Sequence, residues 1–308
     1  MKQPLLLLLF ATTLPPIQAE KVSLQKGKGK VIVNIEGKLF TEYLYDGHGR
    51  SKPVLYPILG PGGARMTRDY PFKKGTPGEA SDHPHHASLW FTHGEVNGIS
   101  FWHVGKNTGV IKHQKFIKVD GNTISTTNKW LSAKGEEQCS DDTSISFHAL
   151  GENRAIDFDI TVHASSGDVK FGDTKEGSMG IRTNPALRVK GSVAKGQAIN
   201  SEGIKGKAVW GKRAKWVDYW GPINGNTVGI AIFDHPGNQR HPTWWHARDY
   251  GLVAANPFGV HNFEGKPKGT GDLVIKSGEK VRFRYRFLFH AGDVKAAKIS
   301  ENYTTWAK

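Results

Sequence analysis

The sequence predicts an all-β protein folded as an antiparallel β-sandwich. Its 308 residues include 37 glycines and 15 prolines, which divide the chain into many short runs. Apolar and polar residues alternate within these runs, as in strands with one buried face, and few segments show the 3.6-residue period of a helix. Turns rich in Gly, Asn and Asp separate the runs, which favours stacked antiparallel sheets over parallel βαβ units.

The first expected element is a β-hairpin over residues 30–45, KVIVNIEGKLFTEYLY, with its turn at Glu36-Gly37. Further alternating segments of strand length cover residues 122–133, 143–151, 154–165, 227–235 and 280–292. A short helix is expected within residues 290–303. The chain shows no repeat, linker or break in composition, so residues 20–308 are expected to form a single β-sandwich domain.

The strand expected over residues 281–290 separates its side chains by chemistry. One face carries Val281, Phe283, Tyr285 and Phe287, and the other carries Arg282, Arg284 and Arg286. Because successive side chains of a strand point to opposite faces, the apolar set is expected in the core. The basic set is expected either in solvent or on the floor of an anion-binding cleft.

The N-terminus resembles a secretory signal peptide. Residues 1–19, MKQPLLLLLFATTLPPIQA, contain a basic residue, a short apolar run and a small residue, Ala19, at the end. We therefore expect an exported protein, periplasmic or extracellular, whose mature chain starts near Glu20. No later segment has the length of a membrane span. The single cysteine, Cys139, excludes an intrachain disulfide and has no neighbouring base that would activate it.

The formal net charge of +14 limits the expected partners. The excess is spread along the chain in short Lys/Gly runs and forms no arginine-rich stripe, so nucleic acid is not an expected partner of this exported protein. An acidic oligosaccharide or polysaccharide, or an anionic cell surface, is a better match to the charge. A basic surface that merely maintains solubility fits equally well.

The segment SDHPHHASLWFTHGEVNGISFW, residues 81–102, is rich in histidine. In an extended chain His83 and His85 share one face and His86 takes the other, which is a common way to present two imidazoles to one metal ion. Pro84 cannot donate to a central strand, so the segment is expected at an edge or in a loop lining a cavity. A histidine that only donates to a backbone carbonyl is the alternative for each single residue.

A second cluster, FDHPGNQRHPTWWHARDYGLVAANPFG at residues 233–259, repeats the Asp-His-Pro tripeptide. Its candidate site residues are Asp234, His235, Arg240, His241, Trp244, Trp245, His246 and Arg248. Aromatic rings stack on the C–H face of a sugar while charged groups bind its hydroxyls or carboxylate, so this composition suits a sugar site. Trp244 and Trp245 taken alone are more often core residues.

A third segment, GDTKEGSMGIRTNPALR at residues 172–188, supplies Glu176 as a possible general base and Arg182 as an anion-binding group. The concentration of His, Arg and aromatic residues in these segments indicates a shared functional cleft. No serine-hydrolase elbow, zinc-protease motif, phosphate loop or dinucleotide fingerprint is present, which excludes those classes.

Six blocks of the chain resemble a known family in order. They are KPVLYPILGPGGARMTRDYPF, DHPHHASLWFTHGEVNGISFW, KEGSMGIR, KWVDYWGP, FDHPGNQRHPTWWHARDYGLVAANPFG and RFRYRFLFHAGD, from residue 52 to the C-terminus. They resemble a bacterial exported family labelled "methane oxygenase PmoA-like". A particulate methane oxygenase subunit is an integral membrane protein, so the label implies no methane chemistry here.

The resemblance implies a link to carbohydrate metabolism and polysaccharide degradation, and a galactose-mutarotase-like supersandwich fold, in which a cleft histidine and a carboxylate act on a sugar ring. The family blocks map onto Arg68, Asp69, Asp82, His83, His85, His86, Asn97, Glu176, Arg182, Asp234, His235, Arg240, His241, His246 and Arg248. The resemblance assigns no role to any of these residues.

The leading hypothesis is an exported carbohydrate-active enzyme of the lyase, epimerase or hydrolase type that works by proton transfer. The candidate catalytic residues are His85, His246, Glu176 and Asp234. The candidate substrate-binding residues are Arg68, Arg182, Arg240, Arg248, Trp244, Trp245, Asn97, His86, His235 and His241. One alternative is a metal-dependent oxygenase or hydrolase in which His83 and His85 hold copper, iron or zinc. Another is a glycan-binding protein without catalysis.

Overall fold

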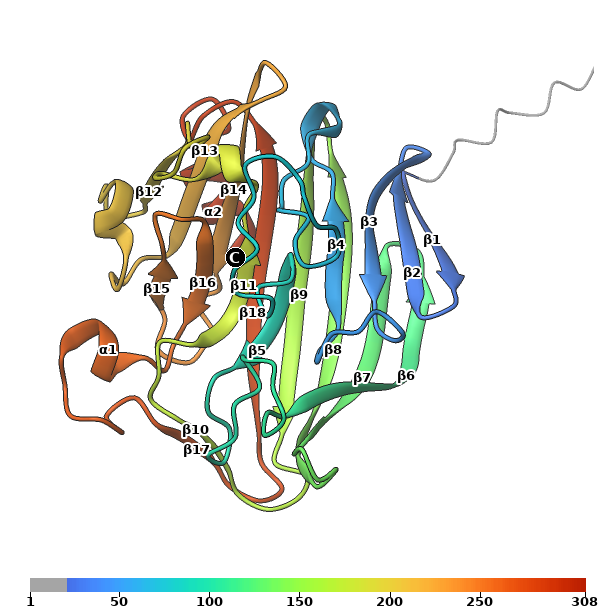
Figure 1. Ribbon diagram of the computed structural model, residues 1–308, viewed down its shortest axis with the longest axis vertical. Helices are drawn as coiled ribbons and strands as arrows, with labels where there is room; N and C mark the ends of the chain where they lie inside the picture. Colours follow the sequence, from blue (N-terminus) through green and yellow to red (C-terminus); the bar gives the residue numbers. More distant parts are fainter. Residues whose placement is uncertain (1–20) are drawn as a thin grey trace, which may run out of the picture.

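Two eight-stranded antiparallel sheets pack face to face in the computed structural model, which describes residues 21–308 (Figure 1). The predicted signal peptide lies outside the described residues. In spatial order the first sheet contains β1 (Val22–Gly27), β2 (Lys30–Ile35), β3 (Lys38–Leu44), β4 (Val54–Ile58), β5 (Leu89–His93), β11 (Gly177–Arg182), β16 (Leu252–Asn256) and β15 (Trp244–Ala247). The second contains β12 (Gln197–Asn200), β13 (Trp216–Ile223), β14 (Asn226–Asp234), β18 (Lys280–Ala291), β9 (Asn153–His163), β8 (Glu137–Leu150), β7 (Thr123–Leu131) and β6 (Val110–Asp120).

The remaining elements are short. β10 (Val169–Phe171) and β17 (Leu273–Ile275) form a two-stranded ribbon, and the helices are α1 (Val260–Glu264) and α2 (Ile299–Trp306). Three 3-10 turns cover Pro61–Gly63, Pro185–Leu187 and Gly206–Val209. α2 packs on the outer face of the second sheet, where its Ile299 and Tyr303 join an apolar cluster with Phe233 and Leu288. No helix within residues 21–308 is long and apolar enough to cross a membrane.

The strands expected from the sequence are confirmed. Residues 30–45 form β2 and β3 around Glu36-Gly37, where both residues have the positive φ that a tight hairpin turn requires, 50° and 75°. The other five segments correspond to β7, β8, β9, β14 and β18, although β8 begins earlier than expected, at Glu137. The expected C-terminal helix is also present, but it starts only at Ile299. The predicted antiparallel β-sandwich is therefore confirmed.

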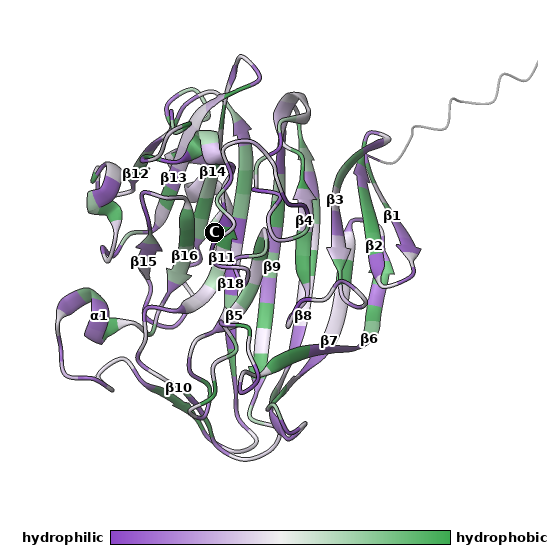
Figure 2. Cartoon of the chain, in the orientation of Figure 1, coloured by the Kyte–Doolittle hydropathy of each residue, from purple (hydrophilic) through white to green (hydrophobic). Residues whose placement is uncertain are grey.

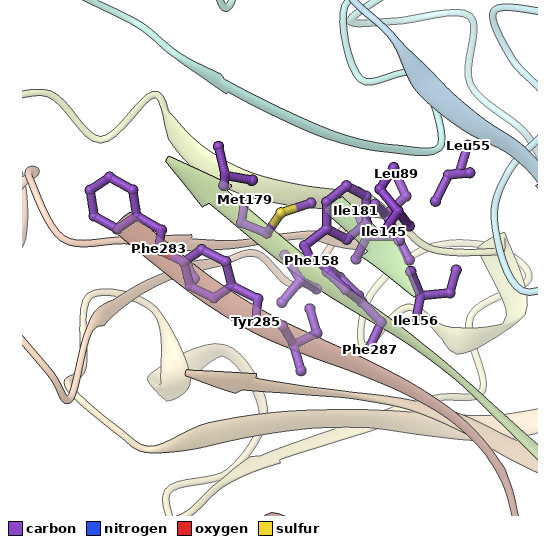
Figure 3. Close-up of a cluster of buried hydrophobic side chains, with 14 of the residues drawn as sticks. Leu55, Leu89, Ile145, Ile156, Phe158, Met179, Ile181, Phe283, Tyr285 and Phe287 are labelled. Carbon is purple, nitrogen blue, oxygen red and sulfur yellow. The ribbon is translucent and has the colours of Figure 1, made fainter. Parts of the chain in front are cut away.

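The main core lies between the two sheets. Phe283 and Phe287 from β18 meet Met179 and Ile181 from β11 in one continuous apolar cluster (Figure 3). Figure 2 shows why the strands supply it, since hydrophobic and hydrophilic residues alternate along strands such as β9. Each fully buried large apolar side chain contributes about 1.5–3 kcal/mol to folding, so this cluster dominates the stability of the sandwich.

The basic face of β18 forms ion pairs within the second sheet. Arg286 donates twice to the Asp157 carboxylate of β9, at 2.6 and 2.7 Å, and Arg282 pairs with Asp159 on the same strand. Of the two alternatives, solvent is confirmed for Arg282, whose side chain is 57% exposed. Neither arginine is free to bind an anion, because each is already paired with a carboxylate of β9. The sequence shows the arginines of β18, but it does not show that β9, which carries the aspartates, is the neighbouring strand.

The strand order of the first sheet brings distant parts of the chain together. β11 lies between β5 and β16, and β15 pairs with β16. In register, Trp90 faces Gly180, Gly180 faces Ala254, and Ala254 faces His246. Their neighbours Leu89, Met179, Val253 and Trp245 belong to the core. The four residues therefore form a row across the outer face of this sheet.

Candidate functional site

The outer face of the first sheet carries a group of aromatic and histidine rings. Gly180 and Ala254 occupy the middle of the row, and their small size leaves room above them. A Cβ atom at Gly180 would lie 2.9 Å from Cζ2 of Trp90, so the indole covers this glycine closely. The large Trp90 ring of β5 therefore lies over Gly180 of the neighbouring strand β11.

Four nearly parallel rings, which we call the ring column, stack on this face: Tyr250, His83, His86 and Trp90. The centroids of His83 and His86 lie 4.8 Å apart with an interplanar angle of 4°. Trp90 lies 5.6 Å from His86 at 9°, and Tyr250 lies 5.9 Å from His83 at 15°. The column joins the first histidine segment to the second, which carries Tyr250.

The loop around Pro84 corrects the expectation for its histidines. Residues 81–88 contain no strand, and His83 has a positive φ of 46°. The segment is therefore a loop, as predicted, but it is not extended. His83 consequently stacks on His86, and its ring stands at 73° to that of His85. The predicted extended backbone is therefore wrong, and side-chain alternation does not apply here. The rings of His83 and His85 nevertheless lie close together, with centroids 5.6 Å apart.

His85 lies beside the ring column and is half-buried. Its ring centroid is 4.4 Å from that of His86 and 4.9 Å from that of His103. Burial, reinforced by the neighbouring His103 and Lys52, lowers the pKa of His85 to about 3. The ring is therefore neutral near pH 7 and keeps a lone pair that can accept a proton or a hydrogen bond.

Arg68 fixes the loop that carries these histidines. Its Nη1 donates to Asp82 Oδ1 at 2.7 Å, and its Nη2 donates to the carbonyl oxygens of Asp82 and His83 at 2.8 Å each. His83 Nδ1 in turn donates to Asp82 Oδ2 at 2.8 Å. Most of the Arg68 donors are thus occupied by the loop, so this arginine positions the histidines and is not placed to bind substrate.

Arg182, at the end of β11, connects the loop to the ring column. Only 2% of its surface is exposed. Its Nη1 donates to His86 Nδ1 at 3.2 Å, its Nη2 lies 3.5 Å from Asp82 Oδ1, and its guanidinium lies over the Tyr250 ring at 4.6 Å. Burial and the nearby Arg68 lower the pKa of Arg182 to about 9.

The downstream part of the site contains His246, Glu176 and Arg248. Burial lowers the pKa of His246 to about 4, although the Glu176 carboxylate acts in the opposite direction. Glu176 itself pairs with Lys175 at 3.1 Å. The Arg248 guanidinium lies over the rings of Tyr250 and Trp210, at 5.4 and 5.7 Å.

A surface pocket of about 200 Å³ adjoins this part of the site. Its lining residues are Lys207, Trp210, Ala247, Arg248 and Asp249. It offers space beside the Arg248 guanidinium. The structure therefore brings His83, His85, His86, Arg182, Arg248, His246 and Glu176 to one face of the molecule.

The second Asp-His-Pro block does not join this group. Asp234 is buried at the end of β14 in the second sheet, and its carboxylate accepts from Asn238 Nδ2, His241 Nδ1 and the Thr243 amide at 2.7–2.9 Å. His235 accepts from the Gly237 amide and packs on Trp306. Asp234, His235 and His241 therefore stabilise their own loop. Their expected place beside the other histidines is corrected.

Four further candidates have structural roles. Arg240 donates to the carbonyl oxygens of Pro257, Gly271 and Asp272 and so ties two loops together. Asn97 adopts a positive φ in a turn and accepts from the Lys170 amide at 2.8 Å. Trp245 is a core residue whose indole donates to the Ala214 carbonyl, and Trp244 is buried under Arg213. Neither tryptophan forms an exposed platform for a glycan.

No group of three or more His, Cys, Asp or Glu side chains within residues 21–308 is arranged to hold a metal ion. The predicted pair of His83 and His85 therefore finds no third ligand of these types in the described part of the chain.

The sequence did not single out several residues of the site. Trp102 is buried and packs against His86 and Trp90, at centroid distances of 5.5 and 5.4 Å. Lys52 is also buried and donates to the Trp102 carbonyl at 3.4 Å. Burial, followed by the charge of Arg50, lowers the pKa of Lys52 to about 7. Trp102 lies within the histidine segment itself, which is a usable signal, but nothing in the sequence shows that Lys52 is buried.

Residues 30–304 match the model of a family of unknown function, DUF6807. The chain belongs to this family. The family description carries no methane oxygenase label. No curated protein matches this DUF6807 chain.

Several solved structures are similar to this DUF6807 protein. An α-galactosidase of glycoside hydrolase family 36 from Geobacillus stearothermophilus is 8% identical, with 90% of this chain and 42% of that chain covered and a TM-score of 0.42. A galactose mutarotase-like protein from Clostridium acetobutylicum is 10% identical, with 88% and 98% covered and a TM-score of 0.39. A polysaccharide lyase is 11% identical, with 89% and 33% covered and a TM-score of 0.35. The chain thus spans less than half of the galactosidase and of the lyase. Mutarotase-like proteins, whose fold the sequence resemblance implies, are among these structures.

Proposed function

We propose that this DUF6807 protein is a carbohydrate-active enzyme that acts on a sugar or glycoside by proton transfer at the outer face of the first sheet. The observation that carries the proposal is the position of Tyr250. Its ring stacks on His83 while the guanidinium groups of Arg182 and Arg248 lie over it, at 4.6 and 5.4 Å. Rings beside fixed hydrogen-bond donors and neutral imidazoles are what sugar binding and proton transfer require.

His85 is the proposed proton acceptor, because it is neutral, half-buried and next to the ring column. His246 and Glu176 are the proposed partners on the downstream side, where the carboxylate acts on the imidazole. Asp234 is not part of this proposal, since its carboxylate already holds the loop of the second block. Elimination, epimerisation and hydrolysis all use such groups.

The test is turnover of a panel of neutral and acidic oligosaccharides, with products identified by mass spectrometry and NMR. His85→Gln and Glu176→Gln are expected to reduce the rate by about 100-fold or more, the usual contribution of a general acid or base. His163→Gln, on β9 of the second sheet, is the matched control and is expected to keep the wild-type rate. Glycan binding without turnover would contradict the proposal and identify a binding protein.

We also propose that the protein acts outside the cytoplasm, on the basis of the signal-like residues 1–19. N-terminal sequencing of the protein from fractionated cells tests this. A mature chain that starts near Glu20 in the periplasm or the medium is the expected result. A cytoplasmic chain that retains Met1 would contradict it.

A further inference from the structure

Three buried N–H groups without an acceptor lie on neighbouring rings of the site. They are Nε2 of His86 and the indole Nε1 of Trp90 and Trp102, none of which has a hydrogen-bond partner among the described residues. The three ring centroids lie 5.4–5.6 Å from one another. The three side chains are 0–1% exposed. A buried donor without a partner costs about 1–3 kcal/mol, so three together in one place need a common explanation.

Arg182 determines which nitrogen of His86 carries the proton. A guanidinium group can only donate, so His86 Nδ1, 3.2 Å from Arg182 Nη1, must be the acceptor. Burial lowers the pKa of His86, and the neighbouring His85 imidazole and Arg182 guanidinium lower it further, so the ring is neutral. Its single proton therefore resides on Nε2. His86 presents a hydrogen-bond donor to a ligand and is not placed to act as a base.

The charges around these rings are unbalanced. Arg68, Arg182 and Lys52 are each about 2% exposed. Within residues 21–308, Asp82 is the only carboxylate that pairs with either arginine, at 2.7 Å from Arg68 and 3.5 Å from Arg182. Among the described residues the Lys52 ammonium contacts the Trp102 carbonyl at 3.4 Å and the Trp90 ring at 5.8 Å, and neither of these groups carries a negative charge. Buried cations are normally paired, so this surplus favours an anionic ligand.

We propose that His86, Trp90, Trp102 and Arg182 form a subsite for the carboxylate of an acidic sugar, so that the substrate is a uronate or a uronate-containing glycan. This inference rests on the proposed function and adds its substrate class. The ring N–H groups donate to the carboxylate oxygens. Arg182, which contacts the opposite edge of the His86 ring at Nδ1, supplies positive charge from there, as does the protonated form of Lys52. The more exposed His83 and His85 lie against His86, so a ligand would reach it past these two side chains.

Matched sugars test the substrate class in the wild-type chain. Calorimetric titrations would compare galacturonate with galactose, glucuronate with glucose and mannuronate with mannose, together with their short oligomers. In at least one pair the acid is expected to bind tenfold or more tightly than the neutral sugar, and the difference is expected to shrink at high salt. Equal affinities within every binding pair would overturn the inference and leave the proposed function standing.

Two variants test the residues. Arg182→Gln and His86→Phe are each expected to weaken binding of the acidic sugar about tenfold to a hundredfold. His86→Phe keeps a ring in the column but removes its Nε2–H donor, together with the Nδ1 acceptor for Arg182. It keeps the Arg182 charge, so it remains informative if Arg182→Gln fails to fold. Arg282→Gln, on the outer face of the second sheet, makes the same charge change at a distance and is expected to bind as the wild type does.

The other outcomes are distinguishable. Wild-type affinity for the acidic sugar in both folded variants would overturn the subsite. If acetate binds as tightly as the uronate, the subsite recognises a free carboxylate, and the inference that the substrate is an acidic sugar is overturned. Absence of binding and turnover with every sugar, acidic or neutral, would refute the proposed function and with it this inference.

Discussion

The two Asp-His-Pro tripeptides of this chain have the same sequence and opposite surroundings. Asp82 is 42% exposed at its side chain and is shared between Arg68, Arg182 and His83. Asp234 is 1% exposed. Its two oxygens accept three hydrogen bonds from the loop that follows it. The first block lies beside rings whose N–H groups have no hydrogen-bond acceptor among the described residues. In the second block, the hydrogen bonds of Asp234 all come from its own loop.

The difference shows that a repeated motif does not imply a repeated role. In the second block the residues at positions 238, 241 and 243 bond back to Asp234 and close a loop between the two sheets. Asp82 instead contacts its neighbour His83, Arg68 at 14 residues' distance and Arg182 at 100 residues' distance. Asp82 therefore lies where three segments of the chain meet, those around residues 68, 82 and 182. Functional residues are often found in loops at such places.

The largest expected effect is the loss of stability in Asp234→Ala. Three donors then lose their acceptor in a buried place, so the free energy of unfolding is expected to fall by about 3 kcal/mol. Urea denaturation followed by circular dichroism measures it. A loss below about 1 kcal/mol would mean that Asp234 does not hold its loop, and the two blocks would then differ less than the structure indicates.

The next largest effect is a pH dependence of the unfolding free energy, caused by His246 and His86 on the first sheet. The folded pKa of His246 is about 4 and that of His86 is also lowered, both mainly by burial, against about 6.5 in the unfolded chain. The unfolded state therefore binds more protons below pH 6.5, and stability falls on acidification. For His246 this amounts to about 2 kcal/mol between pH 7 and pH 5.

Unfolding free energies of wild type, His246→Gln and His86→Gln at pH 7 and pH 5 measure this dependence. Each variant is expected to lose less stability on acidification than the wild type does. Identical losses in all three proteins would show that these imidazoles are not buried in their neutral form.

Asp82→Asn is expected to have a smaller effect on stability, about 1 kcal/mol, because Asp82 is partly exposed and Asn keeps an oxygen for Arg68. It changes the charge of the site, so affinity for an acidic sugar is expected to rise. Denaturation and calorimetric titration on the same preparation separate the two effects. A loss of stability equal to that of Asp234→Ala would remove the contrast between the blocks.

The smallest effect is expected for His235→Ala. His235 is only partly buried and accepts one amide hydrogen bond, from Gly237. A change within about 0.5 kcal/mol in the free energy of unfolding is expected, as at most surface positions. Thermal unfolding measures it, and a drop of several degrees would give His235 a structural role that its contacts do not show.

The sequence predicts the sheets well because alternation is a local property. β18, for example, follows from its residues alone, with Phe283 and Phe287 inward and the arginines outward. The site is harder to predict, since it depends on strand order. Nothing local shows that β11 lies between β5 and β16, or that Trp90 and His246 therefore share a row.

Backbone conformation limited the prediction of the histidines. His83 and His85 are two apart, which places them on one face only if the chain is extended, and the positive φ of His83 breaks that condition. Lys52 is buried against the Trp90 ring and the Trp102 carbonyl, which come from other segments, so its residue type gives no signal.

The most direct test of the account is the protonation of His86, measured by NMR on protein labelled with ¹⁵N in its histidines and assigned with His86→Gln. The account predicts a neutral ring with its proton on Nε2 from pH 5 to pH 8, and a shift of that N–H resonance when the preferred uronate is added. A ring that titrates near pH 6.5, or that carries its proton on Nδ1, would contradict the contact with Arg182 and the subsite built on it.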